Sequence, residues 1–197
     1  MSITKNLFVH LRVHSTYSLS EGMLSFDYLS NFCIDNNQPA MAITDTSNMF
    51  GVLEFSLKMV SAGIQPIIGM QVNIAERTES EENVGEVVLI AKNKIGYKNL
   101  LILASDLSIN DNFEKYLSFT NLEKFKDGLI LLTGGVENGF IGQPAAQGNK
   151  NKVYNRLKEL ERLFKDNLYI ELQRHGLVAE NTAEKILLDL SQKLDLP

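Results

Sequence analysis

The chain has 197 residues, of which 44% are hydrophobic and 22% charged, and its formal net charge is −5. This length suits one domain with a sizeable core, and the composition excludes disordered and fibrous proteins. A single cysteine, Cys33, excludes an internal disulfide and a zinc cluster built on cysteines, and its apolar helical surroundings indicate a buried, inert thiol. No apolar run reaches the length of a membrane span, and residues 1–6 lack a signal-peptide pattern, so we expect a cytoplasmic protein.

The acidic balance argues against autonomous binding of duplex DNA. A domain that holds a phosphate backbone by itself usually carries a clear basic patch. Here the basic residues are spread along the chain, with a modest cluster at Lys150, Lys152, Arg156 and Lys158. We interpret this cluster as the solvated face of a helix.

Short apolar runs alternate with longer segments of helical periodicity along the chain. The pattern predicts strands at Phe8–His14, Ala40–Thr44, Ile67–Ala75, Glu86–Ala91, Leu129–Leu132 and Leu168–Gln173. It predicts helices at Phe26–Asn36, Met49–Ala62, Lys94–Leu107, Val153–Lys165 and Thr182–Leu194. Gly63 and Pro66 end the second helix, Thr120 with Glu123 indicates a capping box, and Gly134–Asn151 has the composition of a weakly structured connection.

Repeated strand–helix alternation predicts an α/β fold with a mostly parallel sheet. The first predicted strand has an apolar face and a polar face. Val9, Leu11 and Val13 lie on the apolar face, and His10, Arg12 and His14 lie on the polar face. A barrel with a polar interior fits this pattern better than a doubly wound sheet, whose parallel strands are normally apolar on both faces. An open sheet with one wet face is the alternative. Because the last predicted helix runs almost to Pro197, we expect a domain cut before its final unit.

Three groups of polar residues stand where chemistry is possible. His10 and His14 would share one strand face, where two imidazoles can converge on a metal, although a lone pair of histidines is more often a hydrogen-bonded polar pair. Asp45 directly follows the second strand, where barrel enzymes place catalytic residues, but it can also cap a helix that begins at Met49. His175 occupies the same end of the sixth strand or is a turn residue. Phosphate loops, dinucleotide fingerprints and nucleophile elbows are missing from the sequence.

One family combines these motifs in this order. The run FVHLRVHS at 8–15, followed by Tyr17-Ser18 and Glu21-Gly22, resembles the opening of the bacterial replicative DNA polymerase III alpha subunits. Further matches are AITD at 42–45 with Asn48 and Gly51, GIQPIIG at 63–69, GYKNL at 96–100 and GLILLTGG at 128–135. Each motif is weak alone, but the series keeps the family's order and spacing from residue 8 to the end of the chain.

The resemblance implies a PHP (polymerase and histidinol phosphatase) domain over residues 1–197, a distorted (β/α)7-type barrel that is incomplete at its C-terminus. It also implies that intact members hold up to three metal ions at the barrel mouth and can act as 3′–5′ exonucleases or phosphoesterases. The corresponding site in this chain is lined by His10, Arg12, His14, Glu21, Asp45, Thr46, Gln71, Glu86 and His175.

Several of these positions depart from the family's ligand pattern. At the His-x-His motif, Arg12 stands in the first histidine position, and Glu21 stands where an aspartate is usual. Thr46 and Glu86 each take the place of a histidine, Gln71 takes the place of a glutamate, and Gly134 takes the place of a cysteine or histidine. The last ligands of the family would lie beyond Pro197. Arg12 brings a permanent positive charge that repels a metal and can pair with Glu21. We therefore expect no cofactor for this segment, and a site that is empty or binds Zn²⁺, Mn²⁺ or Mg²⁺ weakly.

The resemblance implies a parent protein that is a DNA-directed DNA polymerase, a nucleotidyltransferase whose Mg²⁺ ions are held in a palm domain outside these residues. DNA would be contacted through that parent chain. We expect the segment to be a non-catalytic scaffold that stabilises the polymerase and docks the proofreading exonuclease subunit and other holoenzyme subunits. The alternative is a residual metal-dependent phosphoesterase, 3′–5′ exonuclease or pyrophosphatase that uses the histidines and acids of the site. A third reading, an unrelated barrel hydrolase, would require the motif series to be accidental.

Overall fold

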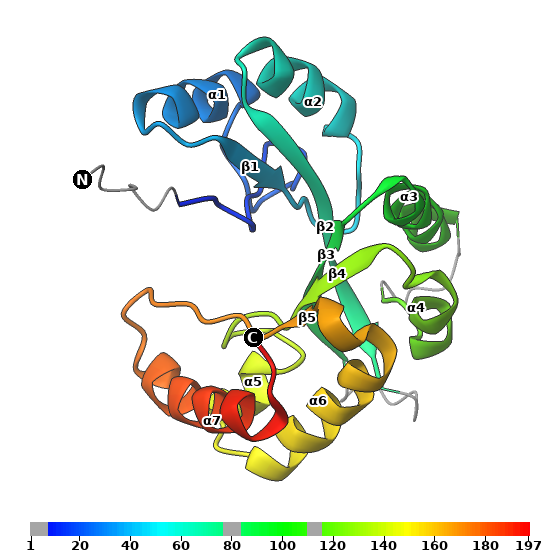
Figure 1. Ribbon diagram of the computed structural model, residues 1–197, viewed down its shortest axis with the longest axis vertical. Coiled ribbons are helices and arrows are strands. Elements are labelled where there is room, and N and C mark those ends of the chain that lie inside the picture. Colours follow the sequence, from blue (N-terminus) through cyan, green and yellow to red (C-terminus); the bar gives the residue numbers. More distant parts are fainter. Residues whose placement is uncertain (1–7, 77–83, 110–115) are drawn as a thin grey trace, which may run out of the picture. The chain divides into compact units, whose positions relative to one another are not determined.

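The computed structural model describes residues 8–76, 84–109 and 116–197, and the chain forms two compact units, Met1–Met70 and Gln71–Pro197 (Figure 1). Helices and strands alternate in both units, so the predicted α/β class is confirmed. Within the described ranges, no helix has both the length and the apolar character needed to cross a membrane.

The first unit packs two helices against a short parallel pair of strands. Its elements are α1 (Phe26–Asp35), β1 (Ala40–Ile43), α2 (Val52–Ser61) and the first part of β2 (Gln65–Ala75). β1 lies parallel to β2, with Ala40 opposite Gln65 and Ile43 opposite Ile68. The N–H of Tyr28 donates to the hydroxyl of Ser25, which caps α1. Gly63 ends α2 as predicted, because its φ of 74° is a conformation that glycine adopts without strain.

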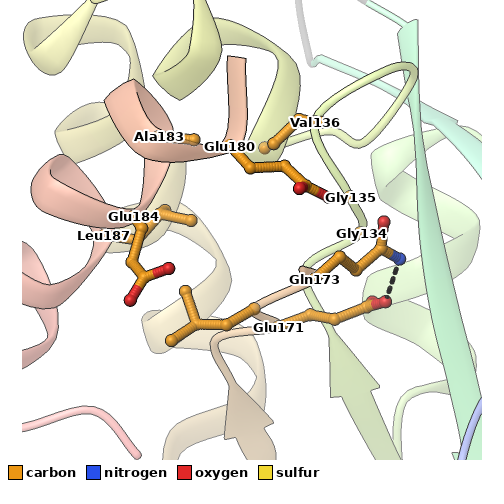
Figure 2. A pocket seen from close by; sticks show the side chains of 11 residues that line it. Gly134, Gly135, Val136, Glu171, Gln173, Glu180, Ala183, Glu184 and Leu187 are labelled. Carbon is orange, nitrogen blue, oxygen red and sulfur yellow. Dashed lines mark hydrogen bonds between the residues drawn. The ribbon is translucent and has the colours of Figure 1, made fainter. Parts of the chain in front are cut away.

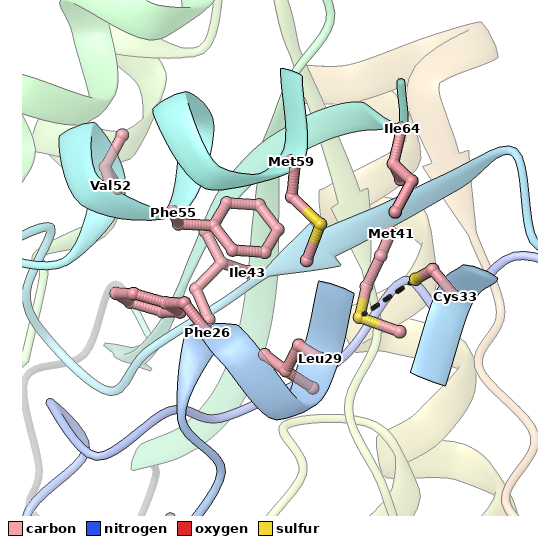
Figure 3. Packing of buried hydrophobic residues seen from close by; sticks show 9 residues of the cluster. All are labelled: Phe26, Leu29, Cys33, Met41, Ile43, Val52, Phe55, Met59 and Ile64. Atoms are coloured by element: carbon pink, nitrogen blue, oxygen red, sulfur yellow. Dashed lines mark hydrogen bonds between the residues drawn. The ribbon is translucent and has the colours of Figure 1, made fainter. Parts of the chain in front are cut away.

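The core of the first unit lies between the two helices and β1, as Figure 3 shows. The cluster consists of Phe26, Leu29, Cys33, Met41, Ile43, Val52, Phe55, Met59 and Ile64. Cys33 is fully buried, which confirms the prediction for this thiol, and burial raises its pKa above the ordinary value.

The strand predicted at 8–14 is wrong, because the segment beside β1 contains one residue too many for a regular ladder. The N–H of Ala42 donates to the carbonyl of His10 at 2.8 Å, and the N–H of Thr44 donates to that of Val13 at 2.9 Å. Ala42 in β1 and Thr44 just after it are two positions apart, but their partners His10 and Val13 are three positions apart, as in a β-bulge. The N–H of Val13 donates instead to Oγ1 of Thr44 at 3.0 Å.

The second unit carries the rest of β2 and the later elements. These are β3 (Val84–Ala91), α3 (Lys94–Ile109), α4 (Phe119–Phe125), β4 (Leu129–Leu132), α5 (Gly142–Ala146), α6 (Lys150–Phe164), the 3-10 turn η2 (Lys165–Asn167), β5 (Leu168–Tyr169) and α7 (Val178–Leu194). The strands follow the order β2-β3-β4-β5. β4 is parallel to β5, but it is antiparallel to β3.

Of the described pairings, β1–β2 and β4–β5 are parallel and β3–β4 is antiparallel, so one pair departs from the predicted parallel pattern. Residues 76–83 alone separate the end of β2 from the start of β3. A parallel connection needs a crossover of about a dozen residues or more, usually a helix. A separation this short therefore favours an antiparallel connection between these two strands.

The sixth predicted strand is also shorter than expected, since β5 ends at Tyr169. Beyond it, the N–H of Glu171 donates to the side chain of Thr133 at 3.0 Å and the N–H of Ile170 donates to the carbonyl of Pro197 at 2.8 Å. These partners replace the backbone ladder that a longer strand would need. The helix that follows begins at Val178, four residues before its predicted start.

Three further predictions in the second unit are corrected. The N–H of Asn121 donates to the hydroxyl of Ser118, so Ser118 caps α4 and the capping box predicted at Thr120 is wrong. The stretch predicted as a weak connection contains α5 and the start of α6. Arg156, predicted on a solvated helix face, is 3% exposed because α6 turns it into the core.

Candidate functional site

The nine predicted site residues are divided between the two units. The first unit contains His10, Arg12, His14, Glu21, Asp45 and Thr46, and the second contains Gln71, Glu86 and His175. The first group lies in or beside the segment that runs next to β1, and the second group lies on three separate elements or connections.

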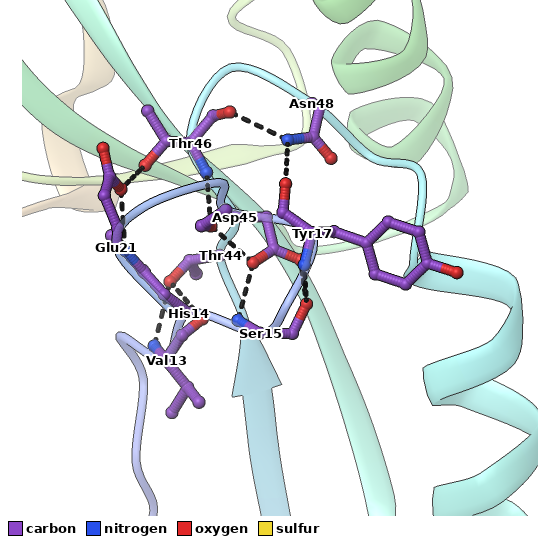
Figure 4. A network of polar contacts seen from close by, with 10 residues as sticks. Val13, His14, Ser15, Tyr17, Glu21, Thr44, Asp45, Thr46 and Asn48 are labelled. Carbon is purple, nitrogen blue, oxygen red and sulfur yellow. Dashed lines mark hydrogen bonds and ion pairs between the residues drawn. The ribbon is translucent and has the colours of Figure 1, made fainter. Parts of the chain in front are cut away.

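Asp45 is the centre of a buried network in the first unit (Figure 4). Its Oδ1 accepts a hydrogen bond from the N–H of Ser15 at 2.7 Å and another from the hydroxyl of Ser18 at 2.6 Å. Its Oδ2 accepts from the hydroxyl of Ser15 at 2.8 Å. Both serines are almost fully buried. The side chain of Asp45 therefore anchors the loop that follows the first segment, and the alternative prediction of a helix cap is wrong, since α2 begins only at Val52.

A second set of contacts leads from this carboxylate to the protein surface. The N–H of Thr46 donates to the hydroxyl of Ser18 at 3.1 Å, and the hydroxyl of Thr46 donates to Oε2 of Glu21 at 2.5 Å. The same Glu21 oxygen lies 3.2 Å from Nδ1 of His14, as Figure 4 shows. The structure thus brings His14, Glu21 and Thr46 together, as the resemblance implies for residues of one site. Their polar atoms contact one another directly.

His10 has different neighbours. Its ring lies edge-on to Phe8 with centroids 4.8 Å apart and is tilted against Phe32 at 5.8 Å. The shared strand face predicted for His10 and His14 is wrong, because no regular strand forms over residues 8–14. The predicted pairing of Arg12 with Glu21 stays a prediction.

His175 belongs to a turn that is organised by Glu180. Oε1 of Glu180 accepts from the N–H of His175 at 2.9 Å and lies 3.1 Å from its Nδ1, while Oε2 accepts from the N–H groups of Gly176 and Leu177. These donors hold the pKa of the Glu180 carboxyl below its ordinary value, with the backbone bond from His175 contributing most. The imidazole of His175 is itself largely exposed. This geometry supports the prediction of a turn residue before a helix.

Glu86 and Gln71 lie on β3 and β2. The backbone of Glu86 pairs with the loop after β4, accepting from the N–H of Phe140 and donating to the carbonyl of Asn138, both at 2.8 Å. Gln71 is buried, with 3% of its surface exposed. Gly134, which aligns with a metal ligand of the family, has a φ of 79°, and a Cβ there would lie 2.3 Å from the carbonyl oxygen of Glu86.

A small hollow in the second unit collects further carboxylates (Figure 2). It is lined by the loop at 134–136, the segment at 171–173 and one side of α7. Nε2 of Gln173 donates to Oε1 of Glu171 at 2.5 Å, and Arg174 pairs with Glu184 at 2.7 Å. The acids around this hollow are therefore engaged with side chains of their own neighbourhood.

The donor set of the described residues fits a metal cluster poorly. Arg12, Thr46 and Gln71 supply a cation, a hydroxyl and an amide where the resemblance implies imidazole or carboxylate ligands. Both oxygens of Asp45 already accept hydrogen bonds, which leaves fewer lone pairs for an ion. Over residues 8–76, 84–109 and 116–197, no group of three or more His, Cys, Asp or Glu side chains is arranged to hold a metal ion.

The residues that sequence reasoning missed are the partners of the acids. Ser15 and Ser18 were part of the family motif but had no assigned role. In the structure both are buried and donate hydrogen bonds to Asp45. Glu180 follows Leu177 by three positions, which is the acidic half of a capping box. The other half requires Ser or Thr, so the signal was incomplete.

Comparisons with known proteins identify the fold and the relatives. The family model described as PHP domain matches residues 10–175. The DNA polymerase III subunit alpha of Caulobacter vibrioides is 35% identical over 196 residues, and that of Pasteurella multocida is 33% identical over 192 residues. Both alignments cover 96% of this chain but 17% and 16% of the relatives, so the chain spans about a sixth of their length.

A solved structure shows the same fold. The protein, described as a metal-dependent phosphoesterase from Bifidobacterium adolescentis, aligns over 95% of this chain and 84% of its own with a TM-score of 0.55. Its sequence identity is 12%, so the likeness concerns the fold alone.

Proposed function

This chain belongs to the PHP domain family, and from this premise we propose that it is the N-terminal PHP segment of a bacterial DNA polymerase III alpha subunit. The supporting observation is that relatives of that name align along almost the whole chain at 31–35% identity. The parent protein would be a DNA-directed DNA polymerase that uses Mg²⁺ held by acids outside residues 1–197. It would contact DNA through those other regions and act in the cytoplasm, where the bacterial chromosome lies.

Within that protein, the segment acts as a non-catalytic scaffold. The observation that carries this proposal is the engagement of Asp45, whose two oxygens accept three hydrogen bonds from Ser15 and Ser18. A carboxylate whose two oxygens both accept hydrogen bonds from an adjacent loop holds that loop in place. The scaffold stabilises the polymerase and docks the proofreading exonuclease subunit, with other holoenzyme subunits reached through the same parent chain.

The chain carries no cofactor of its own under this proposal. Arg12 contributes a charge of the wrong sign for a cation site, and the remaining carboxylates and imidazoles cannot offset several mutually repelling divalent ions. Zn²⁺, Mn²⁺ or Mg²⁺ would bind weakly if offered at high concentration.

Metal analysis and a nuclease assay on one sample test the scaffold role. Protein prepared without chelators is measured for bound zinc and manganese, assayed for 3′–5′ exonuclease activity, and passed over immobilised proofreading subunit. We expect less than stoichiometric metal, no activity and retention on the subunit. Stoichiometric metal together with activity that His14→Ala abolishes would overturn the proposal.

A residual phosphoesterase, exonuclease or pyrophosphatase is the second candidate. It is favoured by the proximity of His14 and Glu21, which leaves one imidazole and one carboxylate of the family's set in contact. The fold likeness to a protein described as a metal-dependent phosphoesterase points the same way. Hydrolysis of p-nitrophenyl phosphate or pyrophosphate that depends on added Mn²⁺ and on Glu21 would distinguish this candidate from the scaffold.

A further inference from the structure

Helix α2 has two apolar faces, and one of them is left exposed by the described residues of the first unit. Val52, Phe55 and Met59 point into the core of the first unit. Leu53, Leu57 and Val60 on the other face are 71%, 65% and 64% exposed, and Phe50, two residues before the helix, is 73% exposed. We call Phe50, Leu53, Leu57 and Val60 the α2 stripe. Single exposed apolar residues are ordinary, but an aligned row of four marks a contact surface.

The spacing of the α2 stripe specifies the shape of its partner. Its members follow one another at intervals of three, four and three residues, so they form one row along the helix. Rows of this kind pack into the grooves between side chains of another helix. A flat sheet or an extended peptide would not match this row over its length.

The charges beside the α2 stripe specify the partner's sign. An open groove next to it is lined by Asp27 of α1 and by Glu54, Leu57 and Lys58 of α2. Lys58 is paired with Asp27, and Glu54 accepts from the hydroxyl of Tyr17 at 3.0 Å, so the rim keeps an excess of negative charge. Residues 8–70 contain Arg12 and Lys58 against five carboxylates. This balance attracts a basic partner and repels phosphate backbones and anionic lipid.

We propose that the α2 stripe and its acidic rim dock a basic amphipathic helix of another protein, with apolar side chains of the partner filling the spaces between Leu53, Leu57 and Val60. A second copy of this chain is a poorer occupant, because a self-standing interface takes roughly 20–30 residues a side. The chain also presents the same acidic rim to its own copy. The inference rests on the proposed scaffold role, for which it supplies the surface and the chemistry of the partner.

Binding of model helices to the 197-residue chain tests the surface. The probe is a dye-labelled peptide of about three heptads with leucines at the stripe's spacing and lysines beside them, and its match has glutamates in place of the lysines. Fluorescence anisotropy should show saturable binding of the lysine peptide and much weaker binding of the glutamate peptide. Leu57→Glu and Leu53→Glu should each weaken binding about tenfold or more, because each places a charge in the contact.

Leu188→Glu is the matched control, because Leu188 is a half-exposed leucine on α7 of the second unit and does not belong to the α2 stripe. It should change the affinity by less than about twofold. Equal loss in all three variants, or equal binding of both peptides, would overturn the proposal. So would a wild-type dimer in sedimentation that Leu57→Glu dissociates, or preferential binding to phosphatidylglycerol vesicles. Circular dichroism of each variant verifies that it is folded.

Further binding results distinguish a failure of the α2 stripe from a failure of the scaffold role. Retention on the proofreading subunit that Leu57→Glu leaves intact would refute the α2 stripe while keeping the scaffold. Peptide binding through the α2 stripe without retention on any holoenzyme subunit would refute the scaffold while keeping the surface.

Discussion

At the residue scale, the acids of the described chain are distinguished by what donates to them. Asp45 and Glu180 are both almost fully buried, and each accepts hydrogen bonds from a loop next to it in space. Burial of a carboxylate without donors would be costly, so these bonds explain why the two acids are tolerated inside. Their common function is to hold the backbone in a defined path.

Removal of the Asp45 carboxylate should destabilise the first unit. Asp45→Ala leaves two serine hydroxyls and the N–H of Ser15 without their acceptor, each in a buried position. We expect the free energy of unfolding to fall by about 3 kcal/mol, measured by urea denaturation at neutral pH. Asp35→Ala removes an exposed carboxylate at the end of α1 and should cost less than about 0.5 kcal/mol. Equal losses in the two variants would contradict the structural role of Asp45.

Glu180 should make the free energy of unfolding depend on pH in the acidic range. Its pKa in the folded chain lies below the ordinary value of 4.5, so its stabilising effect is complete above that value and is lost as the pH falls through the folded pKa. Glu180→Gln should therefore be less stable than the wild type at neutral pH, and the difference should shrink below pH 4.5. Urea midpoints across this range measure the difference. Asp166→Asn, at an exposed position, is the control for removing a carboxylate elsewhere on the chain.

At the element scale, the sequence predicts helices better than strands. Most helices appear within a few residues of their predicted bounds, because a row of apolar side chains repeats over several turns. The strand at 8–14 fails because alternation does not reveal an extra residue, and Leu11, expected inside, is 41% exposed. The predicted length of β5 is wrong because the side chain of Thr133 takes the place of a backbone partner beyond Tyr169. Such tertiary hydrogen bonds leave no periodic signal.

The same limit applies to the candidate site. Motif order located His14, Glu21 and Thr46, which the structure brings into contact. It could not place Ser15 and Ser18 around Asp45, because these contacts join residues about thirty positions apart. The prediction that Arg156 is solvent-exposed, which was made from its residue type, is also wrong. Its burial depends on the strand end and the loop that pack on α6.

Arg156 joins three elements of the second unit. Its Nε donates to Glu76 at the end of β2, its Nη1 donates to the carbonyl of Phe140, and its guanidinium lies 4.1 Å from the centroid of the Phe140 ring. Arg156→Ala removes one partner of a largely buried pair and should lower the free energy of unfolding by about 3 kcal/mol. Arg174→Ala breaks an exposed pair with Glu184 and should cost at most about 1 kcal/mol. Thermal and urea unfolding of both variants measure the contrast, and similar losses would contradict it.

At the scale of the whole molecule, the charge distribution fits a protein-binding role better than a DNA-binding one. The formal net charge is −5, and Arg156, one of the four residues of the predicted basic cluster, is buried and paired. Lys150 and Lys158 are also paired, with Asp189 and Glu161. The basic surface available for phosphate is therefore smaller than the sequence suggested.

The chain alone should not retain duplex DNA at physiological salt. Affinity for a phosphate backbone rises with the number of phosphates that are neutralised, and the formal net charge of this chain is −5. We expect no shift of a short labelled duplex in a gel assay at about 0.15 M salt. Submicromolar binding that Lys150→Glu weakens would contradict this expectation and would require a basic surface in this segment.

The hydrogen bonds to Asp45 also bear on how such a domain can change over generations. Restoring histidines at positions 12 and 46 would leave Asp45 committed to Ser15 and Ser18. Position 134 could not regain a ligand without moving the Glu86 backbone, since any Cβ there overlaps its carbonyl oxygen. Under the proposed scaffold role, a single substitution at one of these positions would therefore disrupt packing without creating a site for an ion. A metal site would require several substitutions made together.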